Sequence, residues 1–313
     1  MRRTTTVRRR ATLYLGLCAL TGLGACSSDP TGTGPALSSA TSADAAAAAQ
    51  DETEQGADAF TLDGIGDPTG ASFSSGALAG TASGAPFSAS LSSIPARIGC
   101  ATVSSTADAD NDGAPDNAVL TFALPACHFD GFRGGSLELT GTITVSDPTP
   151  SSADFAFHSL LTDFTFKATN AQNESFTAVR NGTRDLTGNG AGLTLANNVT
   201  TVRTASGRPS MQVVHNLQFS FTPAAGSTLA RGAPLPSGTI SEAGTLTFTR
   251  GTESRTFTVS TPTPLEYDAS CSGPRRARIR AGEVHWTLAS GGYVRVVWTA
   301  CGARPTRTFV PAA

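Results

Sequence analysis

Apolar and polar side chains alternate along the sequence from about residue 60 to residue 310. In the segment 136–145, Leu137, Leu139 and Ile143 share one parity, and threonines take most of the other. Successive side chains of a β-strand point to opposite faces of a sheet, so this spacing predicts strands with one apolar face. Further strands are expected at 119–124, 154–169, 175–180, 192–204, 211–221, 245–250, 255–260, 278–288, 293–300 and 307–310.

The same region contains no convincing helical period, so parallel folds that need crossover helices are excluded. We therefore expect an all-β domain over 60–313, an antiparallel meander that forms a large sandwich or a half-open barrel. Phe155 and Phe157 share a parity that Phe164 and Phe166 do not, which predicts a β-bulge near 160–161.

The N-terminus has the features of an export signal. Five arginines and no acid lie within the first ten residues, and an apolar run at 11–20 leads through small residues to Cys26. This order predicts a signal peptide over 1–25. The segment 26–59 is rich in Ser, Thr, Ala, Gly and Pro, which predicts a flexible tether because few of its side chains can be buried.

Leu23-Gly24-Ala25-Cys26 resembles the lipobox of bacterial lipoproteins, although Gly24 stands where Ala or Ser is commoner. The resemblance implies cleavage before Cys26, a diacylglycerol thioether on its sulfur, and acyl chains such as palmitate at the new N-terminus. It also implies a cell-envelope location. Ser27 after the cysteine favours transport from the periplasmic side of the inner membrane to the outer membrane.

Removal of residues 1–25 leaves 17 basic residues against 24 acidic ones. A net negative surface makes nucleic acid an unsuitable partner. The expected contact is instead with a membrane, through the N-terminal lipid, and the sequence does not identify a protein or lipid partner.

Four cysteines remain in the domain after Cys18 and Cys26 are assigned to the signal and the anchor. An even number in an oxidising compartment predicts two disulfides. Three pairings are possible, and the short loops favour Cys100–Cys127 and Cys271–Cys301. A zinc site is the alternative, but no Cys-x-x-Cys pair and no suitably spaced histidine supports it.

The sequence from Asp108 to Asp116 places Asp at positions 1, 3, 5 and 9 and Gly at position 6. It resembles the calcium loops of thrombospondin type 3 repeats and EF-hands, in which oxygen ligands surround Ca²⁺. The resemblance fails at position 12, where Val119 replaces the closing acid, so water or a distant residue must complete the coordination. It implies at most a weakly bound calcium ion, and a solvated hairpin loop is the alternative. The implied ligands are the side chains of Asp108, Asp110, Asp112 and Asp116 and the carbonyl of Ala114.

No motif of a nucleophilic, metal-dependent or phosphate-binding enzyme occurs, and we expect no enzymatic activity. His215 lies on the apolar face of its strand, where a core histidine is favoured over a general base. The arginine-rich segment 275–280 could contact lipid headgroups or an acidic polymer, but a solvated strand face is favoured.

Three functional hypotheses follow. The leading one is a non-enzymatic envelope lipoprotein that acts as a binding or structural scaffold. The second is a periplasmic carrier of an apolar or lipid ligand, and the third is a hydrolase of envelope polysaccharide. In the carrier, a cavity would be lined by aromatic side chains at strand spacing, namely Phe155, Phe157, Phe164, Phe166, Phe219 and Phe221.

Overall fold

The structure is a computed structural model, and its described residues all belong to the compact unit formed by 36–313. They are 45, 46, 48, 50, 53, 100–105, 107–110, 114–132, 135–152, 154–230, 235–271, 278–301 and 303–312. The predicted signal peptide, Cys26, most of the predicted tether and the segment 60–99 lie outside the described residues.

Thirteen strands make up about two thirds of the described residues, and all belong to one sheet. They are β1 (Thr102–Val103), β2 (Ala118–Phe122), β3 (His128–Phe132), β4 (Gly135–Ser146), β5 (Phe157–Thr169), β6 (Ser175–Asn189), β7 (Gly192–Ala205), β8 (Met211–Pro223), β9 (Gly238–Arg250), β10 (Glu253–Tyr267), β11 (Ile279–Leu288), β12 (Tyr293–Trp298) and β13 (Thr306–Val310).

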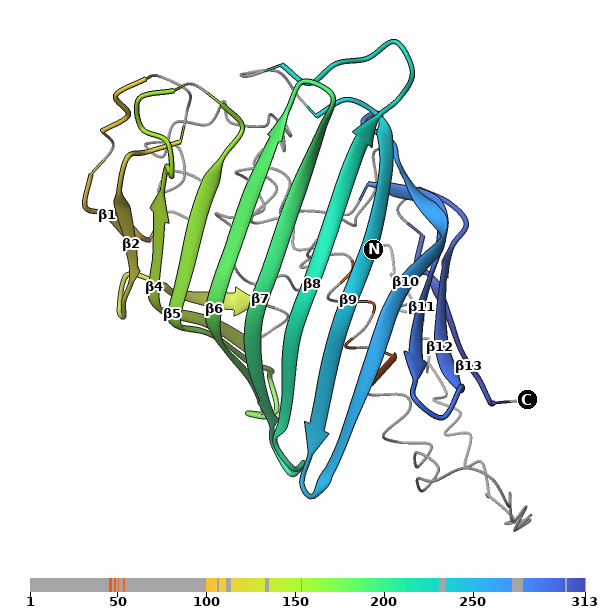
Figure 1. The fold of residues 1–313 in the computed structure, drawn as a ribbon. Helices are drawn as coiled ribbons and strands as arrows, with labels where there is room; N and C mark the ends of the chain where they lie inside the picture. Colours follow the sequence, from red (N-terminus) through yellow and green to blue (C-terminus); the bar gives the residue numbers. More distant parts are fainter. Residues whose placement is uncertain are drawn as a thin grey trace, which may run out of the picture. The chain divides into compact units, whose positions relative to one another are not determined.

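The sheet is an antiparallel meander in which neighbours in sequence are neighbours in space. Its order runs from β1 and β2 through β4 to β13, and β3 pairs separately with β4. Figure 1 shows the strands in this order across one sheet, with the β10 to β13 end turned away from the long central strands. The two ends do not pair with each other, so the all-β meander is confirmed as a single open sheet.

One face of the sheet, which we call the inner face, carries the buried side chains. On β4 these include Leu137, Leu139 and Ile143, each at most 3% exposed, which confirms the parity predicted for 136–145. Residues directly opposite in an antiparallel pair lie on the same face. A central row of the inner face therefore crosses six strands through Leu161, Gly182, Val199, His215, Leu246 and Phe257.

Two glycines within long strands lie beside irregularities of the pairing. Gly182 of β6 has φ +137° and pairs with Leu161, immediately before the register of β5 shifts. Gly244 of β9 has φ +129° and lies beside a similar shift in β10. Only glycine adopts such φ values without strain, and bulges bend a sheet, so both glycines permit the long strands to curve. The bulge predicted near 160–161 is confirmed between Leu161 and Phe164.

Both predicted disulfides are present. Cys100–Cys127 joins the segment before β1 to the turn before β3, with Cα atoms 4.9 Å apart. Cys271–Cys301 joins the segments that follow β10 and β12, with Cα atoms 5.7 Å apart. Each bridge therefore braces one end of the open sheet.

Candidate functional site

The inner face contains charged and polar side chains among its apolar ones. Arg184 of β6 and Asn197 of β7 lie directly opposite each other, and the Arg184 Nε donates a hydrogen bond to the Asn197 Oδ1 at 3.1 Å. Both residues are at most 5% exposed. Burial of a charge is costly unless polar partners surround it, so such residues mark a specialised part of a core. The buried polar residues of β6 to β9 are Arg180, Arg184, Asn197, Thr201, Arg203, His215 and Glu242.

A short part of the N-terminal region contacts this inner face. The described residues between 45 and 53 are helical, and Ala45 and Ala48 are part of the hydrophobic core. Thr53 is fully buried, and its Oγ1 donates a hydrogen bond to the Glu242 Oε2 at 2.7 Å. These positions differ from the flexible tether expected over 26–59. The physical reason is that small alanines can fill an apolar sheet face that the strands alone leave uncovered.

His215 is fully buried on the inner face, opposite Val199 and Leu246. Its environment is that of a core residue.

The aromatic residues expected to line a cavity also lie in the core. Phe164 packs edge-on against Phe122, with ring centroids 5.1 Å apart. Phe157, Phe164, Phe166, Phe219 and Phe221 are each at most 3% exposed, and Phe155 packs against the core from its margin.

The other histidines are paired with carboxylates and not with nucleophiles. The His158 Nδ1 lies 2.5 Å from the Asp185 Oδ1, across β5 and β6. On β11, Glu283 contacts His285 and also receives two hydrogen bonds from Arg295, at 2.7 and 2.6 Å. Arg295 is the main cause that lowers the pKa of Glu283 to about 2. This arrangement is a partly exposed ion-pair network in which Arg295 stabilises the charge of Glu283.

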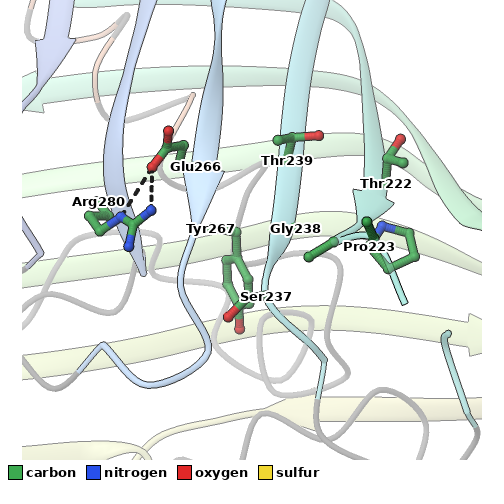
Figure 2. Close-up of a pocket in the computed structure, with 10 residues that line it drawn as sticks. Thr222, Pro223, Ser237, Gly238, Thr239, Glu266, Tyr267 and Arg280 are labelled. Carbon is green, nitrogen blue, oxygen red and sulfur yellow. Dashed lines mark hydrogen bonds and ion pairs between the residues drawn. The ribbon is translucent and has the colours of Figure 1, made fainter. Parts of the chain in front are cut away.

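A cleft of about 370 Å³ lies where β8, β9, β10 and β11 meet. Figure 2 shows Tyr267 at its centre, with Thr222 and Pro223 on one side. On the other side, the Arg280 guanidinium donates two hydrogen bonds to the Glu266 Oε2, at 3.1 and 2.6 Å. The one carboxylate of the lining is thus held in an ion pair, an arrangement that suits polar binding better than acid–base catalysis.

Part of the arginine-rich segment can now be placed. Arg278 donates a hydrogen bond to the Ala269 carbonyl at 2.8 Å, and Arg280 forms the ion pair of the cleft. Arg275 and Arg276 lie outside the described residues. The described arginines therefore make local contacts along the start of β11.

The segment 108–116, which we call the acidic loop, precedes β2. The Ala109 N–H donates to the Asp116 Oδ1 at 3.1 Å, and the Asp116 N–H donates to the Ala107 carbonyl at 2.9 Å. Asp108 and Asp110 are half-buried, Ala114 is fully buried, and Asp112 lies outside the described residues. The described ends of the acidic loop are thus joined by hydrogen bonds, and whether the loop binds calcium stays a prediction.

The buried charged residues of the inner face were not predicted from the sequence, although the alternating pattern of the strands indicates them. Arg180, Arg184 and Glu242 each stand at the parity of buried apolar neighbours on their strands. Their positions in the alternating pattern, and not their residue types, indicate that their side chains point to the inner face.

No family model matches the chain, and neither curated proteins nor solved structures give a match. Within the described part of the chain, no helix has the length and hydropathy needed to cross a membrane.

Proposed function

We propose that the chain is a lipid-anchored protein of the cell envelope, held at the outer membrane through Cys26. Its β domain serves as a non-enzymatic binding or structural scaffold. The lipobox-like residues support the anchor, and the occupied inner face supports the scaffold.

The observation that carries the proposal is the burial of Ala45, Ala48 and Thr53. Ala48 and Thr53 are fully buried, and Thr53 bonds to a carboxylate on β9. The chain thus uses its own segment to cover part of the face on which a carrier would hold its ligand. Because Ala45 comes only 19 residues after Cys26, an anchored domain would stay within about 65 Å of the bilayer.

The anchor is tested by metabolic labelling with palmitate in cells that express the full chain. We expect label and membrane fractionation for the wild type and neither for Cys26→Ala. An unlabelled wild-type chain, or equal membrane association of the variant, would contradict the anchor.

The contact of Thr53 with Glu242 is tested by Thr53→Val in the full chain. Loss of a donor to a buried carboxylate costs about 1–3 kcal/mol, measured as the free energy of unfolding in urea. Thr256→Val is the matched control, because Thr256 is exposed and shares its hydroxyl bond only with Thr247, at 2.9 Å. The control should change stability by less than about 0.5 kcal/mol. Equal effects of the two substitutions would show that the Thr53 contact does not hold the segment.

A second candidate is a carrier of an anionic amphiphile. The observation that favours it is the presence of three buried arginines, Arg180, Arg184 and Arg203, on a face otherwise rich in phenylalanine and leucine. Native mass spectrometry of Cys26→Ala, which lacks the covalent lipid site, distinguishes the two candidates. A co-purifying lipid mass supports the carrier, and the mass of the protein alone supports the scaffold.

A further inference from the structure

The face of the sheet opposite the inner face, which we call the outer face, is exposed along its central strands. Its side chains include Asn216 and Gln218 on β8 and Thr245 on β9, all of them exposed. Within 192–205, 211–223 and 238–260, every residue at the outward positions of the strands is uncharged, and most carry a hydroxyl or an amide group. Exposed surfaces usually mix charges of both signs, so a wide surface without them is a distinct feature.

Charged residues flank this uncharged surface on both sides. On the outer face of β4 and β5, Lys167 donates a hydrogen bond to Glu138 at 2.9 Å. On the outer face of β11 and β12, Arg295 donates two hydrogen bonds to Glu283. The absence of charge is therefore a property of the central strands and not of the whole outer face.

The cleft that contains Tyr267 lies at one end of the uncharged surface. Thr222, Thr239 and Glu266 lie directly opposite one another on β8, β9 and β10, so their side chains share the outer face. All three line the cleft, whose volume of about 370 Å³ lies within the range of about 300–1,000 Å³ that ligand pockets occupy. Tyr267 is 7% exposed and packs edge-on against Phe221, with ring centroids 5.8 Å apart, so it gives the cleft an apolar wall (Figure 2).

The ion pair of the cleft keeps unused hydrogen-bonding groups. Arg280 donates from Nε and Nη2 to the Glu266 Oε2, and no described residue donates to the Glu266 Oε1. The Arg280 Nη1 lies 3.8 Å from the Asp268 Oδ2, which is beyond hydrogen-bond distance. The side chains of Glu266 and Arg280 are 46% and 58% exposed, so a ligand in the cleft can reach both groups.

These groups favour a ligand that is uncharged and rich in hydroxyl groups. Because the guanidinium of Arg280 faces the carboxylates of Glu266 and Asp268, an anionic ligand gains little from it. Because Glu266 is already paired with Arg280, a cation gains little from its carboxylate. A hydroxyl group both donates and accepts, so two neighbouring hydroxyls of a sugar satisfy the Glu266 Oε1 and the remaining Arg280 N–H groups together.

We propose that the cleft and the uncharged outer face of β7 to β10 form a binding site for a neutral glycan. In the cleft, the Arg280 N–H groups donate to hydroxyls of one sugar, the Glu266 Oε1 accepts from them, and Tyr267 offers an apolar surface to the C–H groups. The glycan continues over the threonines of 245–249, which recur at about 6–7 Å along β9. The proposal adds a ligand class to the scaffold function and does not depend on the lipid anchor.

The test is isothermal calorimetry of the full chain bearing Cys26→Ala, which keeps the domain and removes the lipid site. The probes are the neutral polysaccharides dextran, mannan and galactan, together with dextran sulfate, an anionic derivative of the first. We expect a measurable Kd for at least one neutral polysaccharide and weaker binding of dextran sulfate. No binding of any neutral polysaccharide, or equal or tighter binding of dextran sulfate, would overturn the proposal, whereas the anchor is judged separately by palmitate labelling.

Arg280→Ala removes the donors of the cleft and should weaken the Kd for the bound neutral polysaccharide by at least about tenfold. The matched control is Arg295→Ala. Arg295 also donates two hydrogen bonds to a glutamate of the outer face, at 2.7 and 2.6 Å, but it lies outside the cleft. The control should leave the Kd unchanged, and equal effects of the two substitutions would overturn the proposal.

Thr245→Glu tests the uncharged surface, because a neutral ligand would cover the new carboxylate without a counter-charge. Thr245 is exposed and lies between Asn216 and Thr258 of the neighbouring strands. Thr162→Glu is its control, since Thr162 is exposed on β5, outside the uncharged surface. We expect a Kd at least about fivefold weaker for Thr245→Glu alone, and equal Kd values in the two variants would overturn the proposal. Circular dichroism verifies the fold of each variant, and the Thr245→Glu comparison decides the outcome if Arg280→Ala does not fold.

Discussion

Substitution of Gly182 by alanine should destabilise the domain through a clash with the neighbouring strand. Gly182 lies in the middle of β6 at φ +137°, and a Cβ built there would lie 2.1 Å from the Asn198 carbonyl oxygen of β7. The obstacle is backbone, so no side-chain rotation can relieve it. The strands must separate locally, or β6 must change its φ.

The cost can be estimated from these two effects. A non-glycine residue in this region of φ and ψ costs about 1–3 kcal/mol. A local separation of β6 and β7 weakens one or two ladder hydrogen bonds, at about 0.5–1.5 kcal/mol each. The middle values of these ranges sum to about 3–4 kcal/mol for Gly182→Ala, which corresponds to a decrease in Tm of about 10 °C for a domain of this size.

Circular dichroism during thermal and urea unfolding measures this loss. Gly207→Ala is the control, because Gly207 also has positive φ, at +72°, but no atom lies within 4 Å of the position that an alanine methyl would occupy there. It should cost about 1–2 kcal/mol from backbone strain alone. Equal losses in the two variants would refute the argument that contact with β7 determines the effect.

Three further predictions concern charge, cross-linking and the core. The pKa of Glu283, about 2, lies below its ordinary value of 4.5, so its ion pair stabilises the fold fully above about pH 4.5 and loses this effect as the pH falls toward 2. Since Arg295 is 45% exposed, screening limits the effect to about 1–2 kcal/mol, and Glu283→Gln should flatten acid unfolding curves over this range. Replacement of both Cys100 and Cys127 by serine opens a bridge of separation 27 and should cost about 3.5 kcal/mol in urea. Phe219→Ala removes a fully buried ring and should cost about 3–5 kcal/mol in the same assay.

Each of these three predictions has a result that would contradict it. An unchanged acid transition in Glu283→Gln would mean that the ion pair is too well hydrated to matter. A double serine variant as stable as the wild type would mean that the unfolded chain gains little freedom from the open loop. A small loss in Phe219→Ala would mean that the inner face can collapse around the cavity.

The faces of the strands and the lengths of β7, β8 and β11 could be predicted from the sequence, but the lengths of β6, β9 and β10 could not. Alternation correctly indicated the buried side of β4 and β8 because those strands place apolar residues at one parity. β6 runs to Asn189, whereas its expected strand ended at 180. The polar stretch after 180, which includes Gly182 and Arg184, has the composition of a turn, and only pairing with β5 and β7 keeps it extended.

The candidate sites depend on contacts that local sequence does not encode. The acidic loop was recognisable because its aspartates are close in sequence. Asp147, whose N–H donates a hydrogen bond to the Pro115 carbonyl of this loop, looks in the sequence like an ordinary turn residue before Pro148. Its position next to Pro115 follows from the pairing of β2 with β4, which brings the ends of these strands together. In the same way, Thr53 and Glu242 are 189 residues apart, and no periodicity links them.

A single open sheet creates a packing requirement that explains the use of the N-terminal segment. A sandwich covers the apolar face of each sheet with the other, whereas a lone sheet needs another element of the chain to exclude water from that face. Here Ala45, Ala48 and Thr53 contribute to that covering, and Glu242 gives the segment a specific polar contact within it. The described residues between 45 and 53 are therefore part of the fold. Their removal should expose apolar area of the inner face and lower the stability of the sheet itself.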